Sequence, residues 1–348
     1  MESVLPAFIT FILTCTAVQF LKPLAQFVGL VDIPNGRKQH QGEVPLIGGL
    51  AIYLSILLVS STFFEYSREL NIYLISAALI LFLGILDDKY DLSVKLRIVS
   101  QVIIASLMIF GAEIYLSSLG HILYFFELRL SFVGILLTVI AVIAAINAFN
   151  MVDGIDGLAG CLSLITFASL AFLLYRVDSP WFMLPVLYVS ALLAYLMFNL
   201  RWPSSKLHKI FMGDAGSMLI GLTVVWLLVI GTSTENSAFH PVTALYLIAI
   251  PLMDMAAIMY RRVKKGHSPF TADRDHLHHI FERAGYNRRQ TLIRISFISL
   301  ILAFTGILCE FFNVPEWIMF FVFVTIFIVY NWALAHVWQI ITWLKRNE

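Results

Sequence analysis

Charged residues are scarce in this chain of 348 residues, where Asp, Glu, Lys and Arg together make up only 13 %. A soluble domain carries about 25 % of these residues. Hydrophobic residues make up 60 %, and the mean hydropathy is +0.87. These values exclude a soluble globular protein. They also exclude a disordered chain, because disorder requires low hydrophobicity and high net charge.

Cysteine is scarce as well, and the net charge is close to zero. Cys15, Cys161 and Cys309 each lie in an apolar run, and their spacing matches neither a disulfide framework nor a zinc site. We interpret them as small packing residues. The formal net charge of +1 predicts no nucleic-acid partner. The first residues lack the positive segment of a signal peptide, so the first apolar run is expected to remain as a membrane span.

Long apolar runs dominate the chain. A membrane-spanning helix needs roughly 20 such residues, and the sequence predicts an all-α polytopic membrane protein with about eleven transmembrane helices in one domain, 1–348. The third run is short, so we expect it to tilt little or to be screened by its neighbours. The runs lie near residues 3–21, 46–64, 71–86, 98–117, 131–149, 158–175, 182–200, 217–233, 242–260, 292–311 and 316–338.

The distribution of Lys and Arg predicts the orientation in the membrane. Twenty of them lie in loops after the odd-numbered runs and in the C-terminal tail, whereas the other side holds only Arg68, Arg129 and Arg176. The positive-inside rule therefore places the N-terminus outside and the C-terminus in the cytoplasm. The predicted cytoplasmic loops cover about residues 22–45, 87–97, 150–157, 201–216 and 261–291.

Clusters of Asp, Asn, His and Gly concentrate in these cytoplasmic loops, while the outer loops are short and chemically plain. A transporter typically holds its polar groups near the middle of the membrane, between discontinuous helices. The one-sided pattern favours an enzyme at the inner membrane surface. Such an enzyme would act on one membrane-borne and one cytosolic substrate.

The first cluster is Asp87, Asp88 and Asp91, at the cytoplasmic end of the third run. Three carboxylates in five residues repel one another unless a cation lies among them or one binds a proton. The cluster therefore indicates either Mg²⁺ binding or a general base. Lys95 and Arg97 follow and suit a phosphate or a lipid headgroup.

The second cluster covers residues 147–157, a stretch without Lys or Arg between two apolar runs. Asn150, Asp153 and Asp156 recur every three residues, so a helical turn would direct all three the same way. Gly154 and Gly157 allow backbone or ligand to come close. A merely exposed loop would not need these residues at the end of a span.

The third cluster is Phe211 to Ser217, directly before the eighth run. A glycine-rich turn that opens a helix offers free N–H groups and a positive dipole end to a phosphate. Asp214 would hold a cation there, and Phe211 would stack on a nucleobase or serve as an interfacial aromatic residue.

The fourth cluster is a basic loop that contains His276, His278 and His279. Its cations would attract a diphosphate or anionic lipid. Zinc binding is a weaker alternative, because no cysteine or further ligand set accompanies the histidines. Lys38 belongs to another basic loop, and Asp254 lies inside the ninth run, where we expect it to be paired or near the interface.

Taken in order, these motifs resemble those of the polyprenyl-phosphate N-acetylhexosamine-1-phosphate transferases, from about residue 20 to 290. Leu277 interrupts a histidine run that is continuous in the peptidoglycan branch, so the chain looks more like the N-acetylglucosaminyl branch. The family implies a multi-pass enzyme of the bacterial inner membrane with a periplasmic N-terminus. It also implies transfer of GlcNAc-1-phosphate from UDP-GlcNAc to undecaprenyl phosphate, with release of UMP and with Mg²⁺ (or Mn²⁺) as cofactor.

The resemblance also assigns roles to residues. Asp214 and Asn150 are the expected metal ligands, and Asp87, supported by Asp88, is expected to deprotonate the lipid phosphate. Direct attack by this phosphate is favoured over a phospho-aspartate intermediate. The other residues expected at catalytic positions are Asp153, Asp156 and His276.

A second group of residues is expected to bind the nucleotide sugar. Asp156 and Phe211 match positions that hold uracil, and the histidines would contact the diphosphate and the sugar. The residues expected to bind UDP-GlcNAc are Asp156, Phe211, Gly154, His278, His279 and Lys38.

Some alternatives stay open. The sugar could be another N-acetylhexosamine, and a lipid-linked-sugar transporter is the competing class, against which the one-sided clusters argue. The resemblance suggests O-antigen or enterobacterial common antigen as the glycan that the product feeds. Whether the chain forms a homodimer is open.

Overall fold

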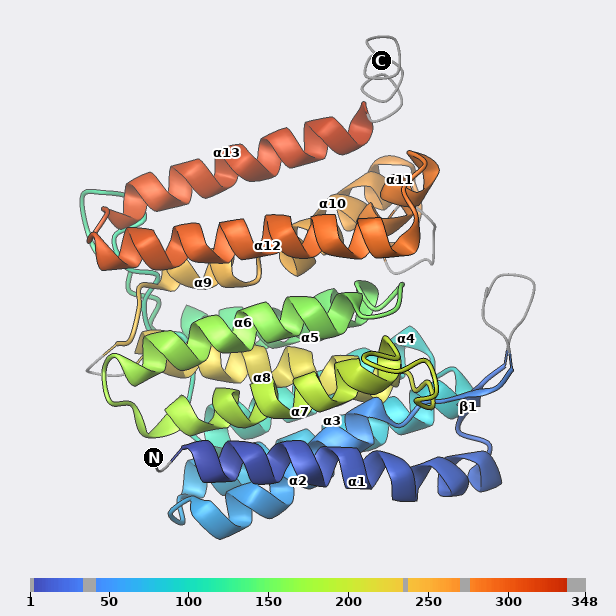
Figure 1. The fold of residues 1–348 in the computed structure, drawn as a ribbon. Coiled ribbons are helices and arrows are strands. Elements are labelled where there is room, and N and C mark those ends of the chain that lie inside the picture. Colours follow the sequence, from blue (N-terminus) through green and yellow to red (C-terminus); the bar gives the residue numbers. More distant parts are fainter. Residues whose placement is uncertain (1–2, 34–41, 234–236, 270–275, 337–348) are drawn as a thin grey trace.

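The computed structural model describes residues 3–33, 42–233, 237–269 and 276–336. Helices dominate it, and they lie side by side so that their connections gather at the two ends of a bundle (Figure 1). The elements are α1 (Val4–Val28), β1 (Val31–Asp32), β2 (Val44–Pro45), α2 (Gly48–Phe63), α3 (Arg68–Tyr90), α4 (Val94–Ser106), the π-helical turn η1 (Leu107–Gly111), α5 (Val133–Met151), α6 (Leu158–Tyr175), the 3₁₀ turn η2 (Pro180–Phe182), α7 (Met183–Asn199), α8 (Gly213–Ser233), α9 (Pro241–Leu247), α10 (Ala249–Lys264), α11 (Leu277–Arg283), α12 (Arg288–Phe311) and α13 (Glu316–Ala335).

The predicted fold class, an all-helical multi-pass membrane protein, agrees with this structure. Nine helices within the described residues are long and apolar enough to cross a membrane. The pair α9 and α10, bent by 83° at its junction, would make a tenth span, and α2 is an apolar helix of 16 residues. The count of eleven and the orientation stay predictions.

Several helices extend beyond the apolar runs that predicted them. The short run at 71–86 belongs to α3, which has 23 residues and continues through its carboxylates to Tyr90, and half of its apolar window is buried in the bundle. In the same way α1 continues to Val28, inside the predicted loop at 22–45. The reason is that a polar residue at a helix end keeps its backbone hydrogen bonds while it lowers the hydropathy on which the prediction relied.

Helix α8 lies in the centre of the bundle, and 94 % of its apolar window is buried. Its first turn is closely contacted by two other helices. A Cβ atom at Gly84 of α3 would collide with the backbone of Ala215, and one at Gly49 of α2 would collide with that of Gly216. Small residues at these crossings let the helix backbones come close, as is typical of packing between membrane helices.

The segment that leads into α8 is also held by backbone hydrogen bonds. Phe211 N–H donates to the Pro45 carbonyl (2.9 Å), and Gly48 N–H donates to the Phe211 carbonyl (2.9 Å). Strand β2 pairs with β1 in antiparallel register, with Asp32 opposite Val44. The small sheet, α2 and the start of α8 therefore form one connected unit at the end of the bundle.

A second apolar cluster forms where α9, α10, α11, α12 and α13 meet the start of α6. The Tyr246 hydroxyl of α9 donates to the Met319 carbonyl of α13 (2.7 Å) and ties the start of the last helix to the cluster. Met319 is 1 % exposed. The last two helices thus pack onto the bundle through their own apolar core.

The predicted orientation can be tested by placing one cysteine at each end of the bundle. Tyr66, between α2 and α3, is 91 % exposed, and Lys264, at the end of α10, is exposed at the opposite end. We expect Tyr66→Cys to react with a membrane-impermeant maleimide on intact cells, and Lys264→Cys to react only after permeabilisation. The unmodified chain is the control for its native cysteines. Labelling of Lys264→Cys from outside intact cells would reverse the topology.

Candidate active site

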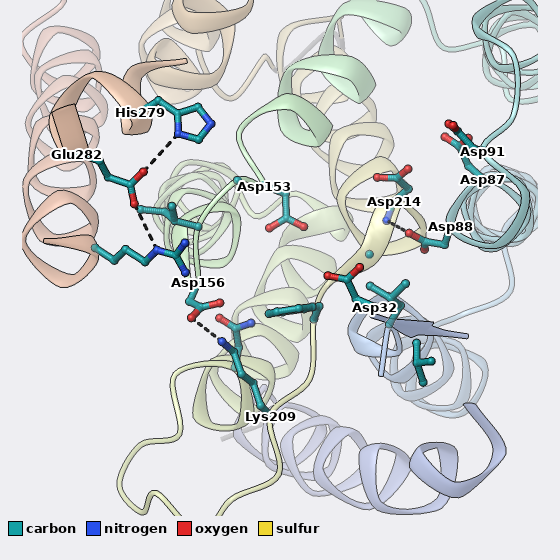
Figure 2. Close-up of a pocket in the computed structure, with 18 residues that line it drawn as sticks. Asp32, Asp87, Asp88, Asp91, Asp153, Asp156, Lys209, Asp214, His279 and Glu282 are labelled. Atoms are coloured by element: carbon teal, nitrogen blue, oxygen red, sulfur yellow. Dashed lines mark hydrogen bonds and ion pairs between the residues drawn. The ribbon is translucent and has the colours of Figure 1, made fainter. Parts of the chain in front are cut away.

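A cavity of about 490 Å³ opens at the end of the bundle that carries β1 and α11 (Figure 2). Its walls come from β1, the end of α3, the α5–α6 turn, the segment before α8, and the starts of α11 and α12. The structure thus brings together four polar clusters that are far apart in sequence. Eight of the residues predicted for the site line this cavity: Asp87, Asp88, Asp153, Gly154, Asp156, Phe211, Asp214 and His279.

Three predicted residues within the described part of the chain do not line the cavity. Asn150, His276 and His278 lie behind its wall, in positions described below. Lys38 lies outside the described residues.

The amino end of α8 is capped by Asp88 of α3. Asp88 accepts hydrogen bonds from the backbone N–H groups of Asp214 (2.8 Å) and Ala215 (3.2 Å). Gly213 precedes them with φ +71°, a left-handed conformation that favours glycine. The expectation that these N–H groups are free for a phosphate was therefore wrong for two of them, because a carboxylate on a neighbouring helix already binds them.

Asp214 is held in place by Asn150 of α5. The Asn150 side-chain amide donates to Asp214 Oδ1 (2.8 Å) and to Ser217 Oγ (3.0 Å). Asn150 therefore orients the Asp214 carboxylate from behind the cavity wall.

Asp87 is buried beside Asp88, and two donors hold it. Arg97 Nη1 donates to Asp87 Oδ2 (2.9 Å), and the Leu92 N–H donates to Oδ1 (2.8 Å). Arg97 was expected to suit a phosphate or a lipid headgroup. It forms instead an ion pair with a carboxylate of the same site, which compensates part of the negative charge there.

The expected helical turn through residues 150–156 is not formed. Helix α5 ends at Met151, and residues 152–157 form turns, so Asp153 and Asp156 lie past the helix end. Figure 2 shows Asp153 in the centre of the cavity. Burial, together with the negative charges of Asp214, Asp88 and Asp156, raises the pKa of Asp153 to about 8. A cation in the cavity would relieve this repulsion.

Asp156 lies at the other side of the cavity in an ion pair with Lys209 (2.7 Å). The Lys209 ammonium is also 5.0 Å from the centre of the Phe211 ring. Sequence reasoning missed Lys209, although its position two residues before Phe211 was a usable signal. The three side chains combine a flat ring with donors and acceptors, which is a suitable surface for a planar polar ligand.

Asn199, at the end of α7, is a second residue that sequence reasoning missed. It is 3 % exposed and lines the cavity, and its amide nitrogen donates to the Ile210 carbonyl (2.9 Å). Its Oδ1 finds no hydrogen-bond partner in the described part of the chain. A buried acceptor without a partner costs about 1–3 kcal/mol, so a ligand with an N–H group would stabilise it.

Of the three motif histidines, His279 lines the cavity. Its Nδ1 lies 3.3 Å from Glu282, which also accepts from Arg288 Nε (3.3 Å). This group places cationic and acidic side chains on the wall opposite the Asp87–Asp88 pair (Figure 2). The weaker zinc alternative finds no support, since no group of three His, Cys, Asp or Glu side chains forms a ligand set among the described residues.

His276 and His278 lie behind His279. His276 Nδ1 is 3.1 Å from Asp254 Oδ2. The His278 ring packs so closely on Gly154 that a Cβ atom there would collide with it. The space that this glycine provides is thus filled by a side chain of the same protein. Burial lowers the pKa of His278 to about 3, together with the charges of His279, His276 and Arg288, so the ring is neutral at physiological pH.

The donor chemistry of the cavity fits a hard divalent cation. Its carboxyl oxygens come above all from Asp153 and Asp214, and a cation beside them would favour the ionised form of Asp153, whose pKa is raised. Mg²⁺ binds through one or two carboxylates together with water and substrate phosphates, and does not require a complete protein cage. The residues therefore fit a metal that arrives with a phosphorylated substrate.

The sequence of the chain is similar to a known family of transferases over nearly its whole length. Residues 70–232 match the model of glycosyl transferase family 4. The chain is 45 % identical over 347 residues to the undecaprenyl-phosphate alpha-N-acetylglucosaminyl 1-phosphate transferase of Haemophilus influenzae, which covers 99 % of this chain and 97 % of the relative. The proteins of the same name from Pasteurella multocida and Escherichia coli K12 are 45 % and 43 % identical, over 97 % of this chain and 95 % and 92 % of the relatives.

The pKa of Asp153 is raised in the folded protein. Replacing Asp153 with a residue that cannot ionise should therefore stabilise the fold, and more so at high pH. An unfolded Asp has a pKa of about 3.9, whereas the folded protein keeps Asp153 protonated up to about pH 8. The stability contributed by this proton is therefore lost as the pH rises from about 4 to 8. With a chelator present, we expect Asp153→Asn to melt at a higher temperature than the parent, by a margin that grows from pH 5 to pH 8.5.

Asp178→Asn is the matched control, because Asp178 is an exposed carboxylate in the turn after α6, at the other end of the bundle. It should melt like the parent at both values of pH. If the difference in melting temperature between Asp153→Asn and the parent is the same at pH 5 and pH 8.5, the Asp153 carboxyl is not protonated in the folded parent.

Proposed function

Because the chain belongs to glycosyl transferase family 4, we propose that it transfers GlcNAc-1-phosphate from UDP-GlcNAc to undecaprenyl phosphate, which yields undecaprenyl-diphospho-GlcNAc and UMP. The observation that carries the proposal is the 45 % identity to transferases of that name over nearly the whole chain. The cavity supports it, since carboxylates and cations surround a space that opens at one end of a bundle of apolar helices.

The nucleotide end of the donor would bind between Phe211 and Asn199. Phe211 offers a ring for stacking, and the unpartnered Oδ1 of Asn199 would accept the uracil N3–H. Asp156 and Lys209 supply a further acceptor and donor at the same wall. The diphosphate would then extend toward His279 and the metal.

The acceptor phosphate would approach from the side of Asp87. Its oxygen attacks the β-phosphorus of the donor, the P–O–P bond breaks, and UMP leaves with the bonding electron pair. Asp87 would accept the proton of the lipid phosphate, while Asp88 fixes the amino end of α8 beside it. We favour this direct attack, because both phosphates would lie in the same cavity.

Mg²⁺ (or Mn²⁺) would stabilise the negative charge on the diphosphate oxygens during phosphoryl transfer. Asp214 is the proposed ligand from this chain, with Asn150 holding its carboxylate and the amide oxygen of Asn150 as a second candidate ligand. Asp153 would contribute negative charge to the same site.

The proposed setting is the bacterial inner membrane, with the cavity on the cytoplasmic face where UDP-GlcNAc is available. The reaction would be the first membrane step of a lipid-linked glycan of the O-antigen or enterobacterial common antigen type. Another UDP-N-acetylhexosamine would need the same nucleotide contacts, so the choice of sugar is decided by assay.

The reaction itself can be tested with purified protein, UDP-GlcNAc labelled in the β-phosphate, and undecaprenyl phosphate. We expect the label and the sugar to move together to the lipid, with UMP released and Mg²⁺ required. Because one diphosphate linkage replaces another, excess UMP should regenerate UDP-GlcNAc from purified lipid product. UDP-GalNAc serves as the comparison sugar. Release of UDP in place of UMP would contradict the proposed phosphoryl transfer.

The proposed roles of Asp214 and Asp87 predict different kinetic defects. Asp214→Asn should lower Mg²⁺-dependent kcat by about 10²–10³-fold, the loss typical for one preorganised electrostatic contact. Asp87→Asn should lower kcat comparably but leave UDP-GlcNAc binding intact, since its proposed partner is the lipid phosphate. Asp178→Asn is the control at the other end of the bundle. Rates close to the parent in both cavity variants would remove this mechanism.

A further inference from the structure

Asp254 is a buried acidic residue of α10 that lies outside the cavity lining. It is 1 % exposed. Its Oδ1 accepts from the Leu277 N–H (3.1 Å) and from the Tyr330 hydroxyl (3.0 Å), and its Oδ2 lies 3.1 Å from His276 Nδ1. A buried carboxylate is costly unless it is hydrogen-bonded. Three partners from two other segments account for its position in the apolar part of this helix.

These contacts join a membrane helix to the histidine loop, which we define as residues 276–279. A carboxylate only accepts hydrogen bonds, so it selects the tautomer of His276 with the proton on Nδ1. The Leu277 N–H belongs to the first turn of α11, so the same side chain also holds the start of this helix. Asp254 thereby determines both the position and the orientation of the loop.

The three imidazole rings of the histidine loop contact one another in a row that ends with His279 at the cavity. The His276 and His278 rings are nearly parallel, with centres 5.6 Å apart, and the His278 and His279 rings are 4.2 Å apart. His278 is confined on its other side by Gly154. Since close-packed groups transmit small displacements, a shift of His276 would move His279, which lines the cavity.

Tyr330 brings the last helix into the same network. It belongs to α13, whose start is held by the Tyr246–Met319 hydrogen bond and by the His121 N–H, which donates to Glu316 (3.0 Å). The Tyr330 hydroxyl reaches Asp254 although Tyr330 itself does not line the cavity.

We propose that Asp254 and Tyr330 are positioning residues that hold the histidine loop so that His279 faces the donor diphosphate, and that α13 stabilises the site through this contact. His276 acts through its neighbours and does not touch substrate. The kinetic part of this inference rests on the proposed function.

The kinetic test compares two hydroxyl deletions on the anchors of α13. Tyr330→Phe should lower kcat/KM for UDP-GlcNAc about 10-fold, the lower end of the loss seen when a supporting partner is removed, with KM for undecaprenyl phosphate unchanged. Tyr246→Phe removes an anchor of the same helix that lies outside the Asp254 network, and should leave both parameters as in the parent. An equal loss of kcat/KM in the two variants would show that Tyr330 only fastens α13, and would overturn the proposal.

A second measurement needs no turnover, so it stays decisive if the proposed reaction is wrong. Diethyl pyrocarbonate modifies accessible neutral imidazoles, and His278 is 3 % exposed. In Asp254→Asn the side chain keeps an acceptor for Leu277 and Tyr330 but turns an N–H₂ group toward His276. We expect peptide mapping to show His278 modified several-fold faster in Asp254→Asn and Tyr330→Phe than in the parent, and at the parental rate in Tyr246→Phe.

If His278 is modified at the parental rate in both Tyr330→Phe and folded Asp254→Asn, the proposal is overturned. If Asp254→Asn fails to fold, as judged by its melting transition in detergent, Tyr330→Phe alone decides. A shift in His278 labelling without the kinetic effect would retain the positioning of the loop and refute the proposed contact of His279 with the donor.

Discussion

The close contact of α2 and α3 with the first turn of α8 is the constraint on which the site depends. Gly84 and Gly49 leave no room for a side chain at these crossings, so the helix backbones come close enough for Asp88 to reach the α8 N–H groups. The same contact places Asp87, Asp88 and Asp214 side by side and thereby creates the negative cavity wall.

The cavity is electrostatically incomplete without a ligand. Arg97 and Lys209 each compensate one carboxylate, but Asp153 faces three others, and burial adds to the cost of its charge. Natural sites often carry such a cost because the ligand removes it, and stability is given up for function. A divalent cation together with a diphosphate would supply the charges that the cavity leaves uncompensated on both walls.

The wall that carries His279 depends on the membrane helices behind it. Asp254 and Tyr330 lie on α10 and α13, so the orientation of a short loop at the membrane surface is determined by groups inside the bundle. This arrangement gives a polar function to two helices that otherwise pack through apolar residues.

The sequence by itself determined the helical multi-pass fold, the polar character of one end, and eight of the 18 residues that line the cavity. Hydropathy and charge distribution are local properties, and each motif carries its own residue types, so these features can be read without the fold. The helix ends, the capping of α8 by Asp88, and the partners of Asn199, Lys209 and Asp254 were decided by tertiary structure. Asp88 and Asp214 are 126 residues apart, and Asp254 and Tyr330 are 76 residues apart. Such contacts follow from how the helices pack, and no local pattern in the sequence encodes which distant side chain a buried carboxylate will meet.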